Sequence, residues 1–114
     1  MPVCFGVEEN TDRLWIALDE KSKQTSDPRD LARVRDILAR PDVALLVDRW
    51  SEDWTQLGWL RLAGRAELVE PANVPAGIVE SLRAKYPQYQ EHALESRPML
   101  TITIEHATRW SARD

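Results

Sequence analysis

The fold is decided by residues 14–68, which read LWIALDEKSK (14–23), then RPDVALLVD (40–48) and WLRLAGRAEL (59–68). The first segment is predicted to be a strand that ends in the polar turn Lys21-Ser22-Lys23. A helix is expected to cross over before the other two segments, which follow each other as strands. This order places a small cationic cluster at the end of a strand, beside a continuous sheet.

Further strands flank this stretch on both sides. Met1–Val7 is apolar, and a polar turn cluster separates it from Leu14–Leu18, so the two segments predict a hairpin. Val43–Val47 is a short unbroken apolar run and predicts a buried strand. Gly58–Val69 alternates, with Trp59, Arg61 and Ala63 on one face. Met99–Glu105 also alternates and is followed by a tail, Thr108–Ala112, that carries Trp110.

Two helices are expected. Asp27-Pro28 is a helix-start signal, and Leu31, Val34, Ile37 and Leu38 share one face of a helix that ends near Arg40-Pro41. A second helix is predicted over Pro71–Lys85 and ends at Tyr86-Pro87, because the residue before a proline is pushed out of helical geometry. With five or six strands and two helices, residues 1–114 predict one mainly β, α+β domain, a barrel-like sheet with peripheral helices.

Composition and charge exclude several classes of function. The net charge is -4, whereas nucleic-acid binders usually carry a basic face. No apolar run is long enough to span a membrane and no secretory signal is visible, so we expect a cytoplasmic protein. The single cysteine, Cys4, is expected to be buried and inert. His92 and His106 lack metal-ligand spacing, and the chain has no glycine-rich phosphate loop and no nucleophile elbow.

The turn Lys21-Ser22-Lys23 is the first candidate binding site. A phosphate needs cationic donors and a hydroxyl or backbone N–H at one point, and a strand end can supply them. The alternative is an ordinary solvated loop, and for the turn taken alone this reading is favoured.

Trp59, Arg61 and Trp110 are the second set of candidates. The two indoles could pack on a conjugated ring, but for each of them taken separately packing in the core or at a dimer interface is favoured. Arg61 could help to hold an anion together with Arg13 and Arg49, or it could be a surface residue; for Arg65, pairing with Glu67 or Asp53 is favoured.

The order of these motifs resembles a known family. The motifs are PVCF, LWIALDEKSK, ARPDVALLVD, WLRLAGRA, AKYPQY and a final RW. Together they resemble the pyridoxamine 5′-phosphate oxidase-like split β-barrel flavoproteins, an FMN-binding-like fold. Within this superfamily the chain looks most like the actinobacterial, PPOX-class coenzyme F-420 (deazaflavin)-dependent oxidoreductases.

The resemblance implies a homodimer with two cofactor sites at the subunit interface. It implies that Lys21, Ser22 and Lys23 bind the phosphate of FMN or coenzyme F-420. Arg61 and Gly64 match a contact strand of the family, and Trp110 matches an aromatic residue near the cofactor of the partner subunit. Gln24 departs from the family pattern by removing a positive charge. Trp59 replaces a glutamine, which weighs against the oxidation of pyridoxamine phosphate.

The family pattern also begins earlier than this chain. Family members usually start with a helix and a strand that have no counterpart before Met1, so we expect a front helix and a first strand to be missing. A misplaced start codon is one explanation. A shortened barrel is expected to expose a sheet edge.

The leading hypothesis is a flavin- or deazaflavin-dependent oxidoreductase that transfers a hydride to or from a small organic substrate of unknown identity. The cofactor would carry the chemistry, and no side chain is an obvious catalytic group. Two alternatives remain open, because fold does not decide function. They are a non-catalytic carrier or sensor with the same barrel, and a dimerisation domain without a functional pocket.

Overall fold

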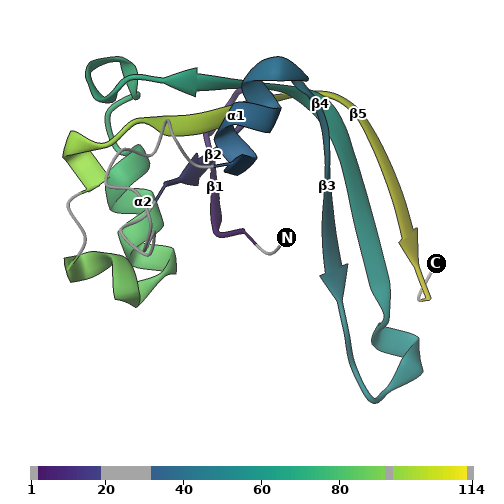
Figure 1. Cartoon of the computed structure of the whole chain (residues 1–114). Helices are drawn as coiled ribbons and strands as arrows, with labels where there is room; N and C mark the ends of the chain where they lie inside the picture. The colour runs from purple at the N-terminus through teal and green to yellow at the C-terminus, as the bar shows by residue number, and fades with distance from the viewer. Residues whose placement is uncertain (1–2, 19–31, 92–93, 113–114) are drawn as a thin grey trace.

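A five-stranded antiparallel sheet forms the body of the protein. The computed structural model describes residues 3–18, 32–91 and 94–112. Within these ranges the strand order is β1-β2-β5-β4-β3, with two helices beside the sheet (Figure 1). The elements are β1 (Phe5–Val7), β2 (Arg13–Ala17), α1 (Ala32–Ala39), β3 (Asp42–Arg49), β4 (Gly58–Val69), α2 (Ile78–Lys85) and β5 (Met99–Ser111), joined in part by the short 3-10 helices η2 (Trp54–Gln56), η3 (Pro71–Asn73), η4 (Pro87–Glu91) and η5 (Leu94–Ser96). The expected mainly β, α+β fold with two peripheral helices is confirmed.

The expected hairpin at the front of the chain is confirmed. β1 pairs antiparallel with β2, with Phe5 opposite Ile16. At the turn, the Glu8 carboxylate accepts hydrogen bonds from Arg13 Nη2 (2.8 Å) and from the indole Nε1 of Trp15 (2.8 Å). These hydrogen bonds, the one from Arg13 above all, hold the pKa of Glu8 below its ordinary value. The buried indole of Trp15 therefore has a partner for its only polar group.

The helices match the expected positions only in part. α1 ends at Ala39, just before Arg40-Pro41, and buries Val34, whereas Leu38 is exposed. The start signal at Asp27-Pro28 lies outside the described residues. α2 begins at Ile78 and not at Pro71, because Gly77 adopts a left-handed conformation (φ 89°) directly before it. α2 ends before Tyr86-Pro87, as the proline predicts.

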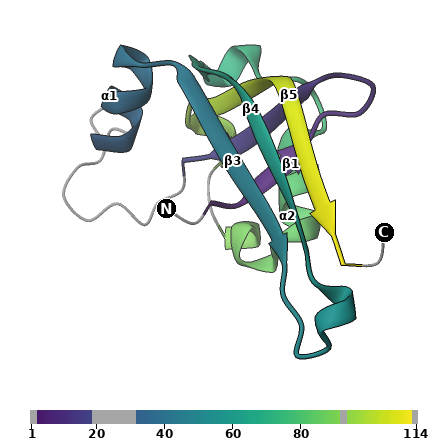
Figure 2. The ribbon, with the colours of Figure 1, turned by 90° about the vertical axis from the view of Figure 1, so that its right-hand side faces the viewer.

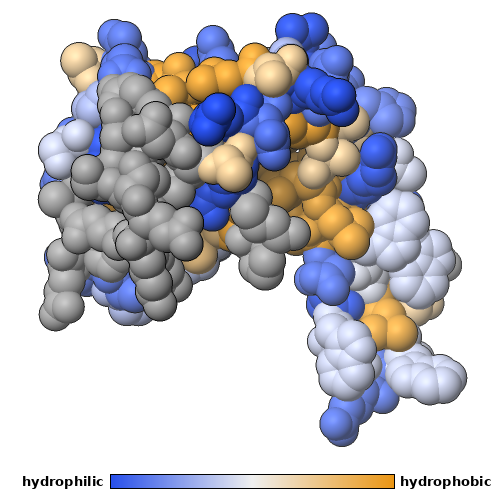
Figure 3. Space-filling model, in the orientation of Figure 1, coloured by the Kyte–Doolittle hydropathy of each residue, from blue (hydrophilic) through white to orange (hydrophobic). Residues whose placement is uncertain are grey.

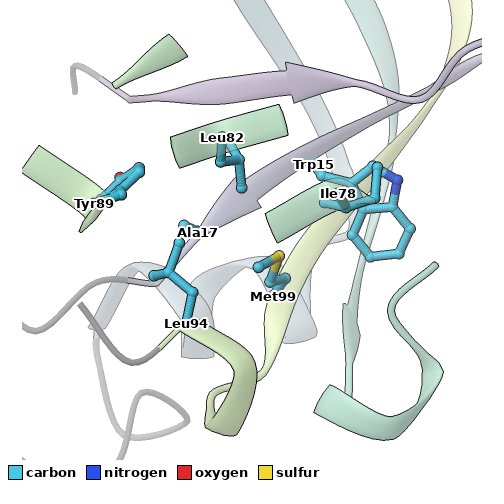
Figure 4. Packing of buried hydrophobic residues seen from close by; sticks show 7 residues of the cluster. All are labelled: Trp15, Ala17, Ile78, Leu82, Tyr89, Leu94 and Met99. Atoms are coloured by element: carbon cyan, nitrogen blue, oxygen red, sulfur yellow. The ribbon is translucent and has the colours of Figure 1, made fainter. Parts of the chain in front are cut away.

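The core consists of two clusters, one on each face of the sheet. Successive side chains of a strand point to opposite faces, so Trp15 and Ala17 on β2 pack under α2, while Ile16 and Leu18 pack on the other face with Val34 of α1. Figure 4 shows the cluster under α2, which consists of Trp15, Ala17, Ile78, Leu82, Tyr89, Leu94 and Met99. Cys4 packs at the edge of this cluster and is partly buried, not fully buried as expected.

β5 is longer than the sequence pattern predicts. The strand runs through Glu105 to Ser111, and its register with β4 ends at Gly58 opposite Ser111. The expectation of a separate tail over Thr108–Ala112 is therefore wrong. The register shifts at Ala63/Gly64, so that Glu105 is an extra residue on β5. This β-bulge bends the strand, and the ladder continues beyond it.

The far half of the β3–β4–β5 sheet projects from the body. We call this part, residues 44–62 with residues 105–111, the arm (Figure 2). The expectation of a buried strand over Val43–Val47 is wrong: β3 is an edge strand, its residues alternate between exposed and partly buried, and Leu46 is 64% exposed. On β5, residues 107–110 are exposed on both faces. Most of the described side chains of the arm are exposed or partly buried, and Leu62 at its base is buried. None of the helices described is long and apolar enough to cross a membrane.

An ion pair between α2 and η5 predicts that part of the protein's stability is sensitive to acid. Arg83 Nη1 lies 2.6 Å from Glu95 Oε2, and this hydrogen bond lowers the pKa of Glu95 from 4.5 to about 2. A carboxyl group whose pKa is depressed on folding stabilises the protein fully above pH 4.5, and this contribution is lost as the pH falls towards 2. We expect the Glu95→Gln variant to lose less of its stability than the wild type between pH 4.5 and 2. Urea midpoints measured at pH 6, 4 and 3 test this, and parallel pH curves of the two proteins contradict it.

Candidate cofactor site

Trp59 and Trp110 form a cross-strand pair on the arm. The register of β4 and β5 sets them directly opposite each other, and residues in this position have Cβ atoms about 5 Å apart. Both indoles are part-exposed, Trp59 at 39% and Trp110 at 47%. Two flat aromatic surfaces are thus held side by side on rigid strands and remain open to solvent.

Arg61 and residues of β3 complete this surface. Arg61 lies two residues beyond Trp59 on the same face of β4 and is opposite Leu46 of β3, while Asp48 is opposite Trp59. A depression of about 520 Å³ is lined by Leu46, Asp48, Arg49, Trp50, Leu57, Gly58, Trp59, Arg61 and Trp110. Figure 3 shows pale, ring-bearing side chains over this end of the molecule. The depression is therefore aromatic, with a guanidinium at its rim.

Arg49 fixes the geometry of the loop between β3 and β4. Its Nε donates to the carbonyl oxygen of Gln56, and its Nη2 lies 3.5 Å from Ser111 Oγ on β5. A Cβ on Gly58 would lie 3.1 Å from this Nη2, so the glycine leaves room for the guanidinium. One side chain thereby joins both ends of the loop to the last residue of β5.

A second set of hydrogen bonds, between Asp53 and Thr55, lies within the same loop. Asp53 caps η2 by accepting hydrogen bonds from the Thr55 hydroxyl (2.7 Å) and the Thr55 backbone N–H (3.0 Å). These bonds, the hydroxyl first, hold the pKa of Asp53 below its ordinary value. The loop that carries Trp50 and Trp54 is therefore well supported, although both indoles are exposed.

Only part of the predicted site lies in the described residues. Trp59, Arg61 and Trp110 come together in one depression, whereas Lys21, Ser22 and Lys23 lie outside the described ranges. The strand that precedes them is anchored at its end, since Arg97 Nε donates to the carbonyl oxygen of Leu18 at 2.7 Å. Arg49, which the sequence suggested beside Arg61, lines the same depression, whereas Leu46 is an addition that sequence reasoning missed. The alternation of β3 could have placed Leu46 on the face of Arg61.

The other charged candidates have separate roles. Arg13 does not join Arg49 and Arg61, because it binds Glu8 and stacks over Trp15. Arg65 Nη1 lies 3.8 Å from Asp42 Oδ1, so Arg65 pairs with Asp42 and not with Glu67 or Asp53, the partners that the sequence favoured. His106 is exposed, and within the described ranges no group of His, Cys, Asp and Glu side chains could hold a metal ion.

The end of β2 and the tryptophan pair lie at opposite ends of β5. β2 ends at Ala17, which is opposite Met99, the first residue of β5. Trp110 lies near the other end of the same strand. The eleven steps along the strand from Met99 to Trp110 correspond to roughly 36 Å of strand contour. The end of β2 and the tryptophan pair are thus far apart within one chain.

Comparison with solved structures supports the fold. The chain is similar to the crystal structure of the conserved hypothetical protein Rv2991 from Mycobacterium tuberculosis, with a TM-score of 0.66 and 16% sequence identity. The match covers 96% of this chain and 66% of the other, so the chain spans just under two thirds of that protein's length. No curated protein matches the sequence.

Comparison with family models covers nearly the whole sequence. The model that matches is described as pyridoxamine 5′-phosphate oxidase, and it aligns with residues 2–111. This range includes every described strand and both helices. The agreement of sequence match and fold confirms the superfamily expected from the motifs: the chain belongs to the pyridoxamine 5′-phosphate oxidase family.

Proposed function

We propose that the protein is a flavin- or deazaflavin-dependent oxidoreductase that binds FMN or coenzyme F-420 on the arm. Members of the pyridoxamine 5′-phosphate oxidase family bind FMN or related flavins. The single observation that carries the proposal is the exposed pair Trp59–Trp110 with Arg61 beside it. The bound cofactor supplies hydride transfer to or from a small organic substrate.

The residues of the depression fit such a group. A fused aromatic ring system is large and flat, and an indole face binds it by offset stacking. Arg61 brings a fixed positive charge to the rim, where it attracts an anionic ring or tail. Leu46 and Leu57 line the same depression and exclude water from one side of the ring. These side chains bind and orient the cofactor.

The phosphate half of the site is assigned to Lys21, Ser22 and Lys23. This assignment rests on the family motif, since the residues themselves lie outside the described ranges. The end of β2 and the tryptophan pair lie at opposite ends of β5, and this separation favours a site that a second subunit completes. We therefore propose a homodimer in which the turn of one subunit and the arm of its partner form each site.

The exposed arm supports this dimer. Its apolar side chains include Leu46, Trp50, Trp59 and Trp110, and all four are substantially exposed. A large apolar patch that is exposed on a single subunit is typical of a surface that binds another protein, and tryptophan is enriched in protein–protein interfaces. Packing against a second copy would cover one face of the arm and leave a pocket for the ring.

Coenzyme titration tests the proposed function. Addition of FMN or of F-420 to the purified protein is expected to quench tryptophan fluorescence in a saturable way. The Trp110→Ala variant is expected to bind about tenfold more weakly, because it loses one stacking surface. Trp54→Ala is the control: Trp54 is also an exposed tryptophan of the arm but does not line the depression, so its removal should leave the affinity unchanged.

The outcomes separate the three functions. Saturable binding with hydride transfer to an added acceptor supports the oxidoreductase. Binding and reduction without transfer support a carrier or sensor. A protein that binds neither coenzyme contradicts both and leaves the dimerisation domain. The preference between FMN and F-420 follows from the ratio of the two dissociation constants.

A further inference from the structure

The two faces of the arm differ in the side chains that they carry. Successive residues of a strand point to opposite faces, so Asp48, Trp59 and Trp110, which lie opposite one another on three strands, share one face. The other face carries the neighbouring rows of paired residues, and we call it the reverse face. In the order β3, β4, β5 its two outermost rows are Arg49, Gly58 and Ser111, and Val47, Leu60 and Arg109.

The guanidinium of Arg49 lies over Gly58, in the middle of the first row. A Cβ on Gly58 would lie 3.1 Å from Arg49 Nη2, and the same Nη2 lies 3.5 Å from Ser111 Oγ. The Nε of Arg49 donates to the carbonyl oxygen of Gln56, so the side chain is held across the strands. A guanidinium has five N–H donors, so Arg49 can bind an anion while it keeps both partners.

Arg109 brings a second guanidinium to the same surface. It precedes Ser111 by two residues on β5, and same-face neighbours on a strand are roughly 7 Å apart, well within the reach of an arginine. Both arginines line one depression of about 430 Å³, together with Val47, Asp48, Gly58, Trp59, Leu60, Trp110 and Ser111. Two like charges in one depression repel each other, and an anion bound between them removes this repulsion.

Asp48 is the only acidic residue in this lining. It lies opposite Trp59, so its side chain belongs to the other face of the arm. The charge of the reverse face at this depression is therefore that of its two arginines.

The second row adds an apolar part to the depression. Val47 and Leu60 are both partly buried, and Leu60 lies directly opposite Arg109. A volume of about 430 Å³ falls in the range of pockets that bind small molecules. An anion over Gly58 thus has space beside it for an organic group, which would pack on the two aliphatic side chains.

We propose that the reverse face of the arm binds a small phosphate monoester. Its phosphate accepts hydrogen bonds from the guanidinium groups of Arg49 and Arg109 and from the hydroxyl of Ser111. A doubly charged phosphate balances both guanidinium charges, whereas a carboxylate balances one. The sheet separates this site from the tryptophan pair, so the proposal is independent of the cofactor and all of its tests are done without coenzyme.

Three small anions test the chemistry of the ligand. Phenyl phosphate, inorganic phosphate and benzoate are titrated into the isotope-labelled protein at constant ionic strength. With phenyl phosphate, the Nε–H resonances of Arg49 and Arg109 are expected to shift together and to saturate. Benzoate, with one negative charge, should bind at least about tenfold more weakly, and inorganic phosphate, without an apolar part, about threefold more weakly.

The same titrations contain the outcomes that contradict the proposal. Absence of a saturable shift at both arginines overturns it. Benzoate that binds as tightly as phenyl phosphate overturns the assignment to a phosphate. Inorganic phosphate that binds as tightly as phenyl phosphate overturns the assignment to an ester, because the apolar row then contributes nothing.

Substitutions place the ligand on one face of the arm. Arg109→Gln is expected to weaken the binding of phenyl phosphate at least about tenfold, and Ser111→Ala about threefold. Arg61→Gln is the matched control, because it removes the same charge from the other face of β4 and should leave the affinity within about twofold. A loss of binding in Arg61→Gln, with binding kept in Arg109→Gln, puts the ester in the depression of the tryptophan pair and overturns the proposal.

Lys23→Ala separates this site from the phosphate turn that the family motif assigns. Its affinity for phenyl phosphate should equal that of the wild type. Loss of binding in Lys23→Ala, with binding kept in Arg109→Gln, assigns the phosphate to the turn and overturns the proposal.

The pH dependence of the wild type keeps the test valid should a variant not fold. The second pKa of a phosphate monoester is about 6, so most of the ligand loses one negative charge between pH 7.5 and 5. The affinity for phenyl phosphate should fall about tenfold over this range, because both arginines keep their charge. Sulfate stays doubly charged and should bind equally at both pH values. An unchanged affinity for phenyl phosphate, or an equal fall for sulfate, overturns the proposal.

Discussion

Mixing Lys23→Ala subunits with Trp110→Ala subunits is expected to restore about a quarter of the wild-type coenzyme sites, although each variant alone binds poorly. The reason is that each site takes its phosphate turn from one subunit and its tryptophan pair from the other. A mixed dimer then has one site with both substitutions and one with neither. Random exchange makes about half of the dimers mixed, and half of their sites are intact.

The opposite pairing gives the control. Mixing wild-type subunits with subunits that carry both substitutions leaves mixed dimers with no intact site when the site is shared, and with one intact site when it lies within a chain. Coenzyme binding should therefore fall to about a quarter of the wild-type level, not to half. No recovery in the first mixture, together with half of the wild-type level in the second, shows that each chain forms its own site. Fluorescence titration after subunit exchange measures both mixtures.

Gly64→Ala is expected to destabilise the fold by at least about 3 kcal/mol and can prevent folding altogether. Gly64 lies on β4 where the register with β5 shifts. A Cβ there would collide with the carbonyl oxygen of Thr103 and would lie 3.0 Å from its carbonyl carbon. Both atoms belong to the backbone of the neighbouring strand, so no side-chain rotation relieves the collision. The sheet would have to open at the bulge.

Gly6→Ala is the matched control for this substitution. A Cβ on Gly6 would lie 3.3 Å from Leu82 Cδ2, an atom at the end of a flexible side chain, and a shift of a few tenths of an ångström relieves it. Urea denaturation of the three proteins should place Gly6→Ala close to the wild type and Gly64→Ala far below both. Similar midpoints for the two variants contradict the role given to the bulge.

The parts of the fold that follow from local patterns could be predicted from the sequence. The hairpin of β1 and β2 follows from two short β-forming segments around a polar turn. The bounds of β4 follow from strict alternation between Gly58 and Val69, and the end of α2 follows from Tyr86-Pro87. Each of these depends on neighbours in sequence, so a window of a few residues contains the signal.

Other parts depend on contacts that are distant in sequence. The apolar run Val43–Val47 is the same whether its strand lies in the middle of a sheet or at its edge, and only the strand order decides. The polar residues after Glu105 suggest a tail, but the full length of β4 lies alongside and extends the ladder to Ser111. The start of α2 is different, because Pro75 and Gly77 are local signals in the sequence that place the helix start after residue 77.

The candidate site shows the same division. The residue types that suit an aromatic, anionic ligand could be recognised at Trp59, Arg61 and Trp110. Their meeting depends on the register of β4 with β5, which the bulge at Glu105 shifts by one residue. A ladder without this shift would put Trp110 on the other face of the sheet, away from Trp59. No pattern within either strand reveals that shift.

Tyr86 and Lys85 form hydrogen bonds with the backbone of Phe5 at the outer edge of β1. These bonds limit how the protein can assemble. A fibril grows when every unit offers a free strand on both sides, so that each new unit creates the next attachment point. Here the helix end occupies one of the two sides at Phe5. Two molecules that pair through β3 therefore have no second free edge at Phe5 to which a third molecule could add. The hydrogen bonds that hold the end of α2 against the sheet thus also oppose the growth of fibrils.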